Sequence, residues 1–185
     1  MLRATNESPL FSPGDFVQRY GLGSPMSERL DMDFGHDLID NGTSDDYYTP
    51  PFIFEALNVE FDMDVAAPPH GAPWIPAKRS LTIIDDGLTT PWVGRVWCNP
   101  PYSNVTPWAK KLIAHDNGIA LVQMAKSAWF NLVWEKASGA LPLQSNLKFI
   151  KANGEAASIL MPVILFAFGE SNREVLVNSG MGRVR

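Results

Sequence analysis

The chain has 185 residues and a net charge of −5, and this length suits one domain with a sizeable core. The negative charge argues against a polybasic nucleic-acid binder, although it leaves room for a local basic groove. Cys98 is the single cysteine, so an internal disulfide is excluded and a reducing, cytoplasmic compartment is expected. We also expect no signal peptide and no membrane span, because no apolar run reaches the roughly 18 residues required.

Residues 1–46 predict a loosely ordered N-terminal arm, since they are rich in Ser, Gly, Pro and Asp and show little periodicity. The aspartates between residues 31 and 46 do not follow the ligand spacing of an EF-hand loop. We therefore expect a solvated arm there and one domain over residues 47–185.

Order is predicted to begin with a helix that Thr49 caps and whose first turn holds Pro50 and Pro51. A short strand, "EFDMDVAA", follows and ends at Asp64. A proline-rich loop comes next, and "LTIIDD" is expected to form a second short strand that ends in acid.

The rest of the chain alternates between strand and helix patterns. Ser127 is expected to cap the second of two helices and Gly139 to stop it, while Pro162 marks a bulge or an edge in the last strand. The expected strands are 95–98, 118–125, 147–150 and 158–169, and the expected helices are 106–117 and 127–139.

This alternation, followed by a terminal strand pair, predicts an α/β fold with a mostly parallel sheet. Three predicted strands end in polar residues, namely Asp64, Asp85-Asp86 and Asn99. Ligands of open parallel sheets bind beyond the carboxyl ends of the strands, so these three ends should line one crevice.

The stretch Asn99-Pro100-Pro101-Tyr102 ends the strand that contains Cys98. Two prolines stiffen the turn and hold the Asn99 amide and the Pro100 carbonyl in fixed directions. Two carbonyl oxygens side by side can accept both hydrogens of an amino group, and Tyr102 offers a flat face on which a base can stack. The tetrapeptide therefore predicts a binding site for a planar group that carries an NH2.

The ordered set "YYTPPFIFEAL", "FDMDVAA", "IIDDGL" and "RVWCNPPYS" resembles the phage-type DNA N-6-adenine methyltransferase (Dam) family, from about Tyr47 to about Gly169. The resemblance implies a class I, Rossmann-like methyltransferase fold with a compact mixed sheet, mostly parallel, and a C-terminal antiparallel strand pair. It also implies methyl transfer from S-adenosylmethionine to the N6 amino group of a flipped adenine in DNA, without a metal.

The resemblance carries roles to individual residues. Asp86 would accept a hydrogen bond from the cofactor adenine, and the neighbouring Asp85 is a rival for that role. The implied cofactor-binding residues are Tyr48, Thr49, Pro50, Asp64, Ala66, Asp86 and Leu88, and the implied catalytic residues are Asn99, Pro100, Pro101 and Tyr102.

The chain departs from the usual methyltransferase pattern in two places. Val65-Ala66-Ala67-Pro68 stands where a glycine-rich turn is common. Only about 22 residues separate Asp64 from Asp86, whereas a single strand-helix-strand unit needs about 30. We therefore expect the proline-rich loop to replace at least one element, and the acid for the cofactor ribose is not assigned.

Contact with DNA requires local positive charge. Lys126 is the best single candidate because it lies just past the strand 118–125, and Ser103, Asn104 and Lys148 are further candidates. Other basic residues that contribute are Lys78, Arg79, Arg95, Lys110, Lys111, Lys151, Arg183 and Arg185. No separate recognition domain is visible, so the expected recognition sequence is about four base pairs or fewer. The family name suggests GATC, and a relaxed site is the alternative.

Two further functions stay open on the sequence. The same turn could accept another amino group, such as cytosine N4, RNA adenine or a protein glutamine amide. Alternatively, the chain could be an inactive nucleic-acid-binding relative. Cys98 is expected to be a buried apolar residue and no nucleophile, because it lies on the opposite side of the strand from Asn99.

Overall fold

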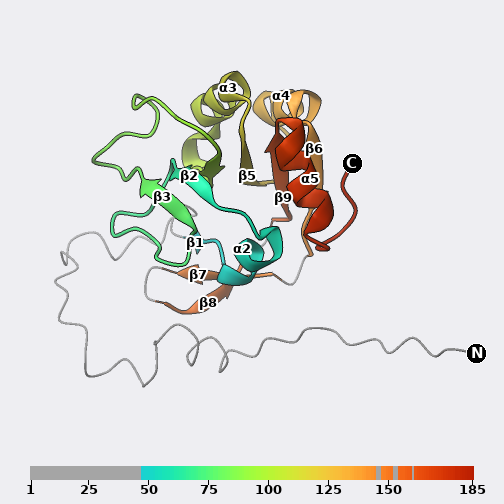
Figure 1. Ribbon diagram of the computed structural model, residues 1–185. Helices are drawn as coiled ribbons and strands as arrows, with labels where there is room; N and C mark the ends of the chain where they lie inside the picture. Colours follow the sequence, from blue (N-terminus) through green and yellow to red (C-terminus); the bar gives the residue numbers. More distant parts are fainter. Residues whose placement is uncertain (1–46, 145–146, 152–153, 160) are drawn as a thin grey trace, which may run out of the picture. The chain divides into compact units, whose positions relative to one another are not determined.

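The structure is a computed structural model that describes residues 47–144, 147–151, 154–159 and 161–185 (Figure 1). The predicted arm, residues 1–46, lies outside the described residues. The main sheet has six strands in the order β3-β2-β4-β5-β9-β6. These strands are β2 (Phe61–Asp64), β3 (Ala77–Ser80), β4 (Val96–Cys98), β5 (Gly118–Gln123), β6 (Gly139–Pro142) and β9 (Val163–Phe168).

The sheet is mixed, as the sequence predicts. β2 pairs in parallel with β3 and with β4, and β4 pairs in parallel with β5. β9 runs antiparallel to both of its neighbours, β5 and β6. The carboxyl ends of β2, β4 and β5 therefore lie at one edge of the sheet, and Asp64 pairs with Trp97 near that edge.

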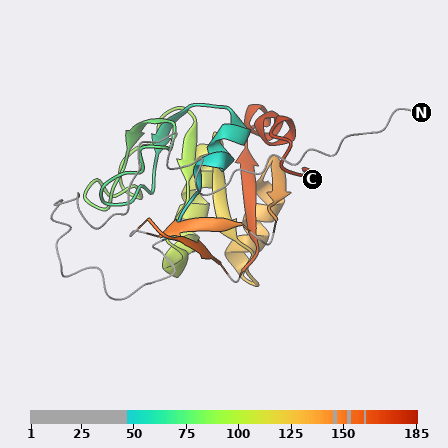
Figure 2. The ribbon, with the colours of Figure 1, turned by 90° about the horizontal axis from the view of Figure 1, so that it is seen from below.

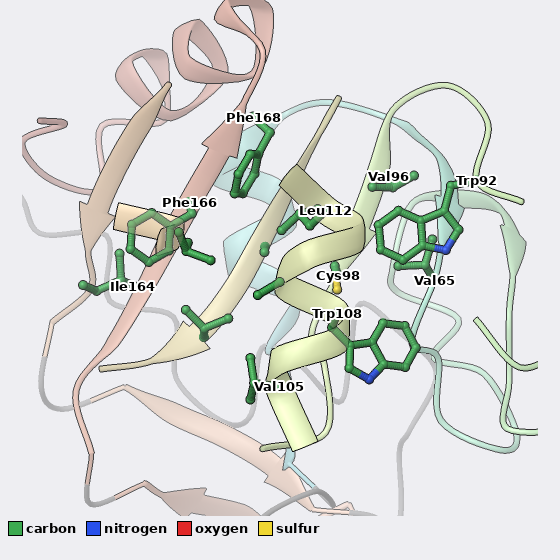
Figure 3. Close-up of a cluster of buried hydrophobic side chains, with 14 of the residues drawn as sticks. Val65, Trp92, Val96, Cys98, Val105, Trp108, Leu112, Ile164, Phe166 and Phe168 are labelled. Carbon is green, nitrogen blue, oxygen red and sulfur yellow. The ribbon is translucent and has the colours of Figure 1, made fainter. Parts of the chain in front are cut away.

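Helices cover both faces of the sheet, as Figure 2 shows from below. They are α2 (Pro51–Leu57), α3 (Val105–His115), α4 (Ala128–Lys136) and α5 (Glu170–Asn178). Side chains alternate between the two faces along each strand. Cys98 packs with Leu112 and Val133 on the face that α3 and α4 cover, and Figure 3 shows part of this cluster. Trp97 packs with Phe54 and Leu176 on the face that α2 and α5 cover.

A second, three-stranded sheet has the order β1-β7-β8. It is built from β1 (Tyr47–Tyr48), β7 (Lys148–Lys151) and β8 (Ala156–Ser158), which pair antiparallel. Phe149 is 1% exposed and anchors this small sheet in the cluster on the α2 face. The small sheet lies beyond the carboxyl ends of the parallel strands (Figures 1 and 2).

Most of the predicted elements are confirmed. The strands that end at Asp64 and at Cys98, the helix α3, the strand β5 and the helix α4 all form where the sequence predicts them. Ser127 caps α4 as expected, since its hydroxyl oxygen accepts a hydrogen bond from the Phe130 backbone N–H at 3.4 Å. Strong hydrophobic periodicity and a clear cap therefore identify these elements locally.

The predicted strand at residues 81–86 is wrong. Ile83 and Ile84 are 83% and 92% exposed, and the Asp85 carboxylate accepts hydrogen bonds from the backbone N–H and the hydroxyl of Thr82, both at 2.9 Å. These local bonds close a turn and compete with strand pairing. The strand beside β2 is instead β3, whose sequence, AKRS, gives no strand signal.

Three other features differ from the sequence prediction. Thr49 does not cap α2, because the helix begins at Pro51 with Pro50 as its N-cap residue and no side-chain capping bond. Gly139 does not end α4 directly, since it opens β6, which the sequence analysis missed. The analysis also missed α5 (Glu170–Asn178), whose two buried side chains give too weak a periodic pattern.

The short connection between Asp64 and β4 contains no helix, and residues 65–95 are all described. β3 is the single strand in this stretch, so loops replace the helices of an ordinary crossover, as the residue count predicts. Over the described part of the chain, no helix is long and apolar enough to cross a bilayer.

Candidate active site

The turn after β4 places Asn99 at the carboxyl edge of the sheet. Pro100 is buried, and Tyr102 begins a short 3-10 helix, Tyr102–Asn104, that leads into α3. The Asn99 side chain is half-buried and makes two hydrogen bonds. Its Nδ2 donates to the Tyr47 carbonyl at 3.1 Å, and its Oδ1 accepts from the Tyr102 hydroxyl at 3.2 Å.

These two contacts orient the Asn99 amide. A backbone carbonyl can only accept, so the atom that faces Tyr47 must be the NH2 nitrogen. The Oδ1 atom is thereby directed toward the Tyr102 hydroxyl. Tyr47 belongs to β1, so the small sheet fixes the orientation of a side chain that the large sheet supplies.

Asp64 lies at the end of β2 and is 2% exposed. Its Oδ1 accepts a hydrogen bond from the Ala66 backbone N–H at 3.3 Å, and no other hydrogen bond to this carboxylate is present among the described residues. Burial raises the pKa of Asp64 to about 7, and the bond from Ala66 opposes this effect. A buried carboxyl with spare acceptor positions can bind a ligand that carries donors or positive charge.

The Tyr48-Thr49-Pro50 segment follows directly on the Tyr47 contact with Asn99. Thr49 is 1% exposed, and its hydroxyl has no hydrogen-bond partner within the described residues. The Thr49 carbonyl is occupied, because it accepts from the Trp74 indole N–H at 2.9 Å. Thr49 and Asp64 thus offer unused polar atoms, which fits a polar cofactor such as S-adenosylmethionine.

The segment Asp85-Asp86-Gly87-Leu88 is a turn rather than a strand end, yet it reaches the same edge of the sheet. A Cβ atom on Gly87 would lie 2.0 Å from the Val65 carbonyl oxygen, so this position requires glycine. Val65 directly follows β2, and the turn is therefore pressed against the end of that strand. The end of β2, the end of β4 and the turn that contains Asp86 therefore lie at one edge of the sheet, although the Asp86 segment is not a strand end.

The structure distinguishes the two neighbouring acids. The Asp85 carboxylate accepts hydrogen bonds from the backbone N–H and the hydroxyl of Thr82. These two bonds lower the pKa of the Asp85 carboxyl. Asp86 has a φ of 48°, and its Oδ1 accepts from the Leu88 backbone N–H at 3.0 Å, in the same turn that brings Gly87 to β2. Asp86 is thus the better placed of the two for a ligand, while Leu88 is half-buried beside it.

The residues expected to contact DNA lie around this edge of the sheet. Ser103 and Asn104 are exposed directly after the Asn99–Tyr102 turn, and Lys126 is exposed three residues beyond the end of β5. Lys148 is exposed on β7, where its ammonium donates to the Ser158 hydroxyl at 2.5 Å. Backbone pairing of β7 with β1 brings the Lys148 strand close to Tyr47.

The thiol of Cys98 directly precedes Asn99 in the sequence. Cys98 is fully buried, and burial strongly raises the pKa of its thiol, so the sulfur is not a nucleophile, as predicted. No cluster of potential metal ligands occurs within the ranges that the structure describes.

Three contributors to the site were not predicted from the sequence. They are the Tyr47 carbonyl, the close approach of Gly87, and Lys111, whose ammonium binds the turn that contains Gly87. A backbone carbonyl leaves no sequence signal. Lys111 resembles an ordinary surface lysine until the tertiary contacts are known.

Comparison with known proteins places these features in a family. Residues 38–171 match the family described as DNA N-6-adenine-methyltransferase (Dam). The DNA N-6-adenine-methyltransferase of Haemophilus phage HP1 (strain HP1c1) is 30% identical over 95 residues, which cover 45% of this chain. The aligned region covers 53% of the phage protein, about half of its length. No solved structure matches the chain significantly. Because the family match extends over well more than half of the residues, the chain belongs to the DNA N-6-adenine-methyltransferase (Dam) family.

Proposed function

We propose that this protein transfers a methyl group from S-adenosylmethionine to the N6 amino group of adenine in DNA. The observation that carries the proposal is the oriented Asn99 amide at the carboxyl end of β4, inside the turn Asn99-Pro100-Pro101-Tyr102 of a Dam-family chain. A reducing cytoplasm, or the cytoplasm of the host if a phage encodes the chain, is the compartment that agrees with its single buried thiol.

The chemistry requires help because the adenine amino nitrogen is a poor nucleophile, with its lone pair delocalised into the ring. The Asn99 Oδ1 and the Pro100 carbonyl would accept the two N6 hydrogens and favour a tetrahedral nitrogen. They would also stabilise the positive charge that develops on this nitrogen, by the same electrostatic logic through which an oxyanion hole stabilises negative charge. S-adenosylmethionine supplies an electrophilic methyl group on a sulfonium when bound.

The side chains of the crevice would hold the cofactor. Asp64 and Thr49 offer the buried polar atoms that remain available, and Asp86 and Leu88 border the end of β2 where the adenine of the cofactor would lie. The positions of Tyr48, Pro50 and Ala66 in the same segments support their roles in cofactor binding. The contribution of the protein is then largely one of positioning.

The target base would leave the duplex to reach Asn99, since the Asn99 side chain is half-buried and the Pro100 that follows it is buried. In the free protein the Tyr102 hydroxyl occupies the Asn99 Oδ1. An incoming N6–H group would replace this hydroxyl as the donor, and the Tyr102 ring would stack on the flipped base. Lys126, Ser103, Asn104 and Lys148 would bind the flanking phosphates.

Product analysis tests the proposal. The purified protein is incubated with unmethylated DNA and labelled S-adenosylmethionine, and the DNA is digested to nucleosides and examined by mass spectrometry. We expect N6-methyl-2′-deoxyadenosine from the DNA, and far less of it from the Asn99→Ala variant. N4-methylcytosine, or methylation of RNA or protein in place of DNA, would assign the site to another amino group. A protein that binds DNA but transfers no methyl group would contradict the proposal that it is a methyltransferase.

A further inference from the structure

Lys111 is inserted into the loop that precedes β4. Its ammonium donates three hydrogen bonds to backbone carbonyls, those of Gly87 at 2.9 Å, Leu88 at 2.8 Å and Thr90 at 2.6 Å. An ammonium has three donors, so all of them are used within the protein. Lys111 is therefore not one of the lysines available for DNA phosphates, in contrast to the expectation from the sequence.

The three carbonyls belong to the turn that contains Asp86 and Leu88. Within this turn, the backbone N–H groups of Thr89 and Thr90 donate to the Asp86 carbonyl at 3.0 and 2.9 Å. Asp86 itself adopts a left-handed φ of 48°, which is unfavourable for a residue that has a side chain. Such a turn needs contacts from outside to hold one conformation, and Lys111 supplies three of them.

Trp92 also binds the turn that contains Gly87. Its indole N–H donates to the Gly87 carbonyl at 2.7 Å, so that this carbonyl accepts from both Trp92 and Lys111. The Lys111 ammonium lies 4.8 Å from the centre of the Trp92 ring, and Trp92 stacks on Trp108 of α3 at 6.3 Å. Figure 3 shows Trp92 and Trp108 with Val65 between the loop and the helix.

The environment of Lys111 is only partly aqueous. The side chain is half-buried, and burial lowers the pKa of its ammonium, while the nearby Asp86 carboxylate opposes this effect. A desolvated ammonium forms stronger hydrogen bonds than an exposed one and loses more when its acceptors are displaced. The hydrogen bonds of the Lys111 ammonium and its partial burial both tie this side chain to the turn that contains Asp86 and Leu88.

We propose that Lys111 is a positioning residue for the cofactor, because its ammonium holds the Asp86–Leu88 turn in the conformation that receives the adenine of S-adenosylmethionine. The inference rests on the proposed function of this crevice. The two roles then belong to different parts of the fold. Lys111 of α3 supports cofactor affinity, whereas Asn99, which follows β4, takes part in the methyl transfer. Loss of the ammonium should therefore weaken cofactor binding and leave turnover at saturating cofactor nearly unchanged.

The test compares Lys111→Met, which keeps an unbranched side chain one atom shorter than lysine and removes the charge, with Lys110→Met. Lys110 is the adjacent lysine of α3, and it is exposed and makes no hydrogen bond within the described structure. Calorimetry measures S-adenosylmethionine binding, and fluorescence anisotropy measures DNA binding. We expect Lys111→Met to raise the dissociation constant of the cofactor by ~10- to 100-fold, the range found when the groups that support metal ligands are removed. Lys110→Met should leave it unchanged.

A chemical rescue separates positioning from a general loss of folding. In Lys111→Cys, reaction of the introduced thiol with 2-bromoethylamine restores an ammonium at nearly the length of lysine. The native Cys98 is fully buried and does not react. We expect the treated variant to regain cofactor affinity, while the treated wild-type protein shows no change. Asp86→Ala serves as the reference variant, because it removes the proposed contact between Asp86 and the adenine of the cofactor.

Each outcome has one meaning. Unchanged cofactor affinity in Lys111→Met, with normal binding by the wild type, would overturn the role of Lys111 and leave the proposed function intact. If the Lys111 variants lose cofactor affinity, DNA affinity and thermal stability together, and the restored ammonium recovers all three, Lys111 has a general structural role. That result would also overturn its role as a positioning residue for the cofactor. If the wild-type protein itself does not bind S-adenosylmethionine, the proposed function falls first and the inference falls with it.

Discussion

The two hydrogen bonds of Asn99 give this residue a fixed orientation before any substrate arrives. Asn99→Ala removes the acceptor and leaves the packing of Pro100 and Cys98 in place. We expect kcat to fall by about 10²- to 10³-fold, the usual effect of deleting one preorganised electrostatic contact. Steady-state methylation assays measure the loss, and Asn178→Ala on the exposed end of α5 is the control. Near-normal turnover by Asn99→Ala would contradict the mechanism.

Tyr102 combines a ring that can stack with a hydroxyl that occupies the Asn99 acceptor. Tyr102→Phe retains the ring, so we expect kcat to stay within a few-fold of the wild type. Tyr102→Ala removes the stacking surface and should cost about 1–3 kcal/mol in binding of the flipped base. Fluorescence of 2-aminopurine at the target position reports base flipping in both variants. If Tyr102→Phe is as defective as Tyr102→Ala, the hydroxyl has a direct catalytic role.

Asp64 makes stability depend on pH. Its folded-state pKa is about 7, against an ordinary value of 3.8, so the folded protein binds this proton more tightly than the unfolded chain does. The stabilisation is therefore complete below about pH 4 and is lost as the pH rises through about 7. Its full size is about 4 kcal/mol, an upper figure based on 1.36 kcal/mol per pKa unit.

Asp64→Asn replaces the carboxyl with a neutral amide of the same shape, so the variant should lose this pH dependence. At about pH 8 we expect the variant to unfold at higher urea concentration than the wild type, and at about pH 4 the two should be similar. The same variant should bind S-adenosylmethionine more weakly. Stability profiles that remain parallel from pH 4 to pH 8 would show that Asp64 is not desolvated in the folded protein.

At the scale of elements, Asn172 connects α5 to the strand ends opposite the crevice. It is fully buried, its Nδ2 donates to the Asn117 side chain at 2.9 Å and to the Phe168 carbonyl at 2.7 Å, and its Oδ1 accepts from the Arg95 Nε at 2.7 Å. One amide thus links α5 to the chain just before β4, to the turn before β5 and to the end of β9. Such a link is worth more than a single exposed hydrogen bond.

Asn172→Ala leaves buried partners unsatisfied, so we expect a loss of about 2–3 kcal/mol in the free energy of unfolding. Because Asn172 lies at the amino ends of β4 and β5, cofactor affinity and kcat at low temperature should be unchanged. Urea titration and methylation assays below the unfolding transition check both expectations. A selective loss of kcat without destabilisation would mean that the two ends of the sheet are coupled.

At the scale of the whole molecule, few of the described elements are candidates for reading DNA. These candidates are the small sheet β1-β7-β8 and the exposed residues Ser103, Asn104 and Lys126, which lie beyond the carboxyl ends of the parallel strands. Each good side-chain pair with a base contributes about 1–3 kcal/mol of discrimination. We therefore expect a recognition sequence of about four base pairs or fewer, with GATC as the first candidate.

Methylation should also fall steeply as salt rises, because phosphate contacts must supply most of the affinity of a chain whose net charge is −5. Sequencing of methylated positions on a random-sequence plasmid, repeated at several salt concentrations, measures both properties. A strict site of six or more base pairs would require a further reading element. If methylation does not change with salt concentration, phosphate contacts do not supply most of the affinity for DNA.

The sequence by itself determined the elements whose signals are local. The apolar runs of β4 and β5 identify buried strands, Ser127 identifies the start of α4, and the prolines after Asn99 predict the stiff turn. The count of residues between Asp64 and Asp86 also showed that helices must be missing there. Each of these inferences depends on chain stiffness, periodicity or length, which act over a few residues.

Tertiary structure alone decided which residues meet. β3 is a strand because β2 offers an open edge, although Ala77–Ser80 has no strand pattern, and the more apolar Ile83-Ile84 pair stays exposed because the Asp85 carboxylate closes a turn. The orientation of Asn99 depends on a carbonyl 52 residues away in sequence, and the Asp86 turn is held by Lys111 from a later helix. Backbone acceptors and long-range contacts leave no periodic trace, so the sequence predicted which residues follow the strands, and the fold determined how those residues are held.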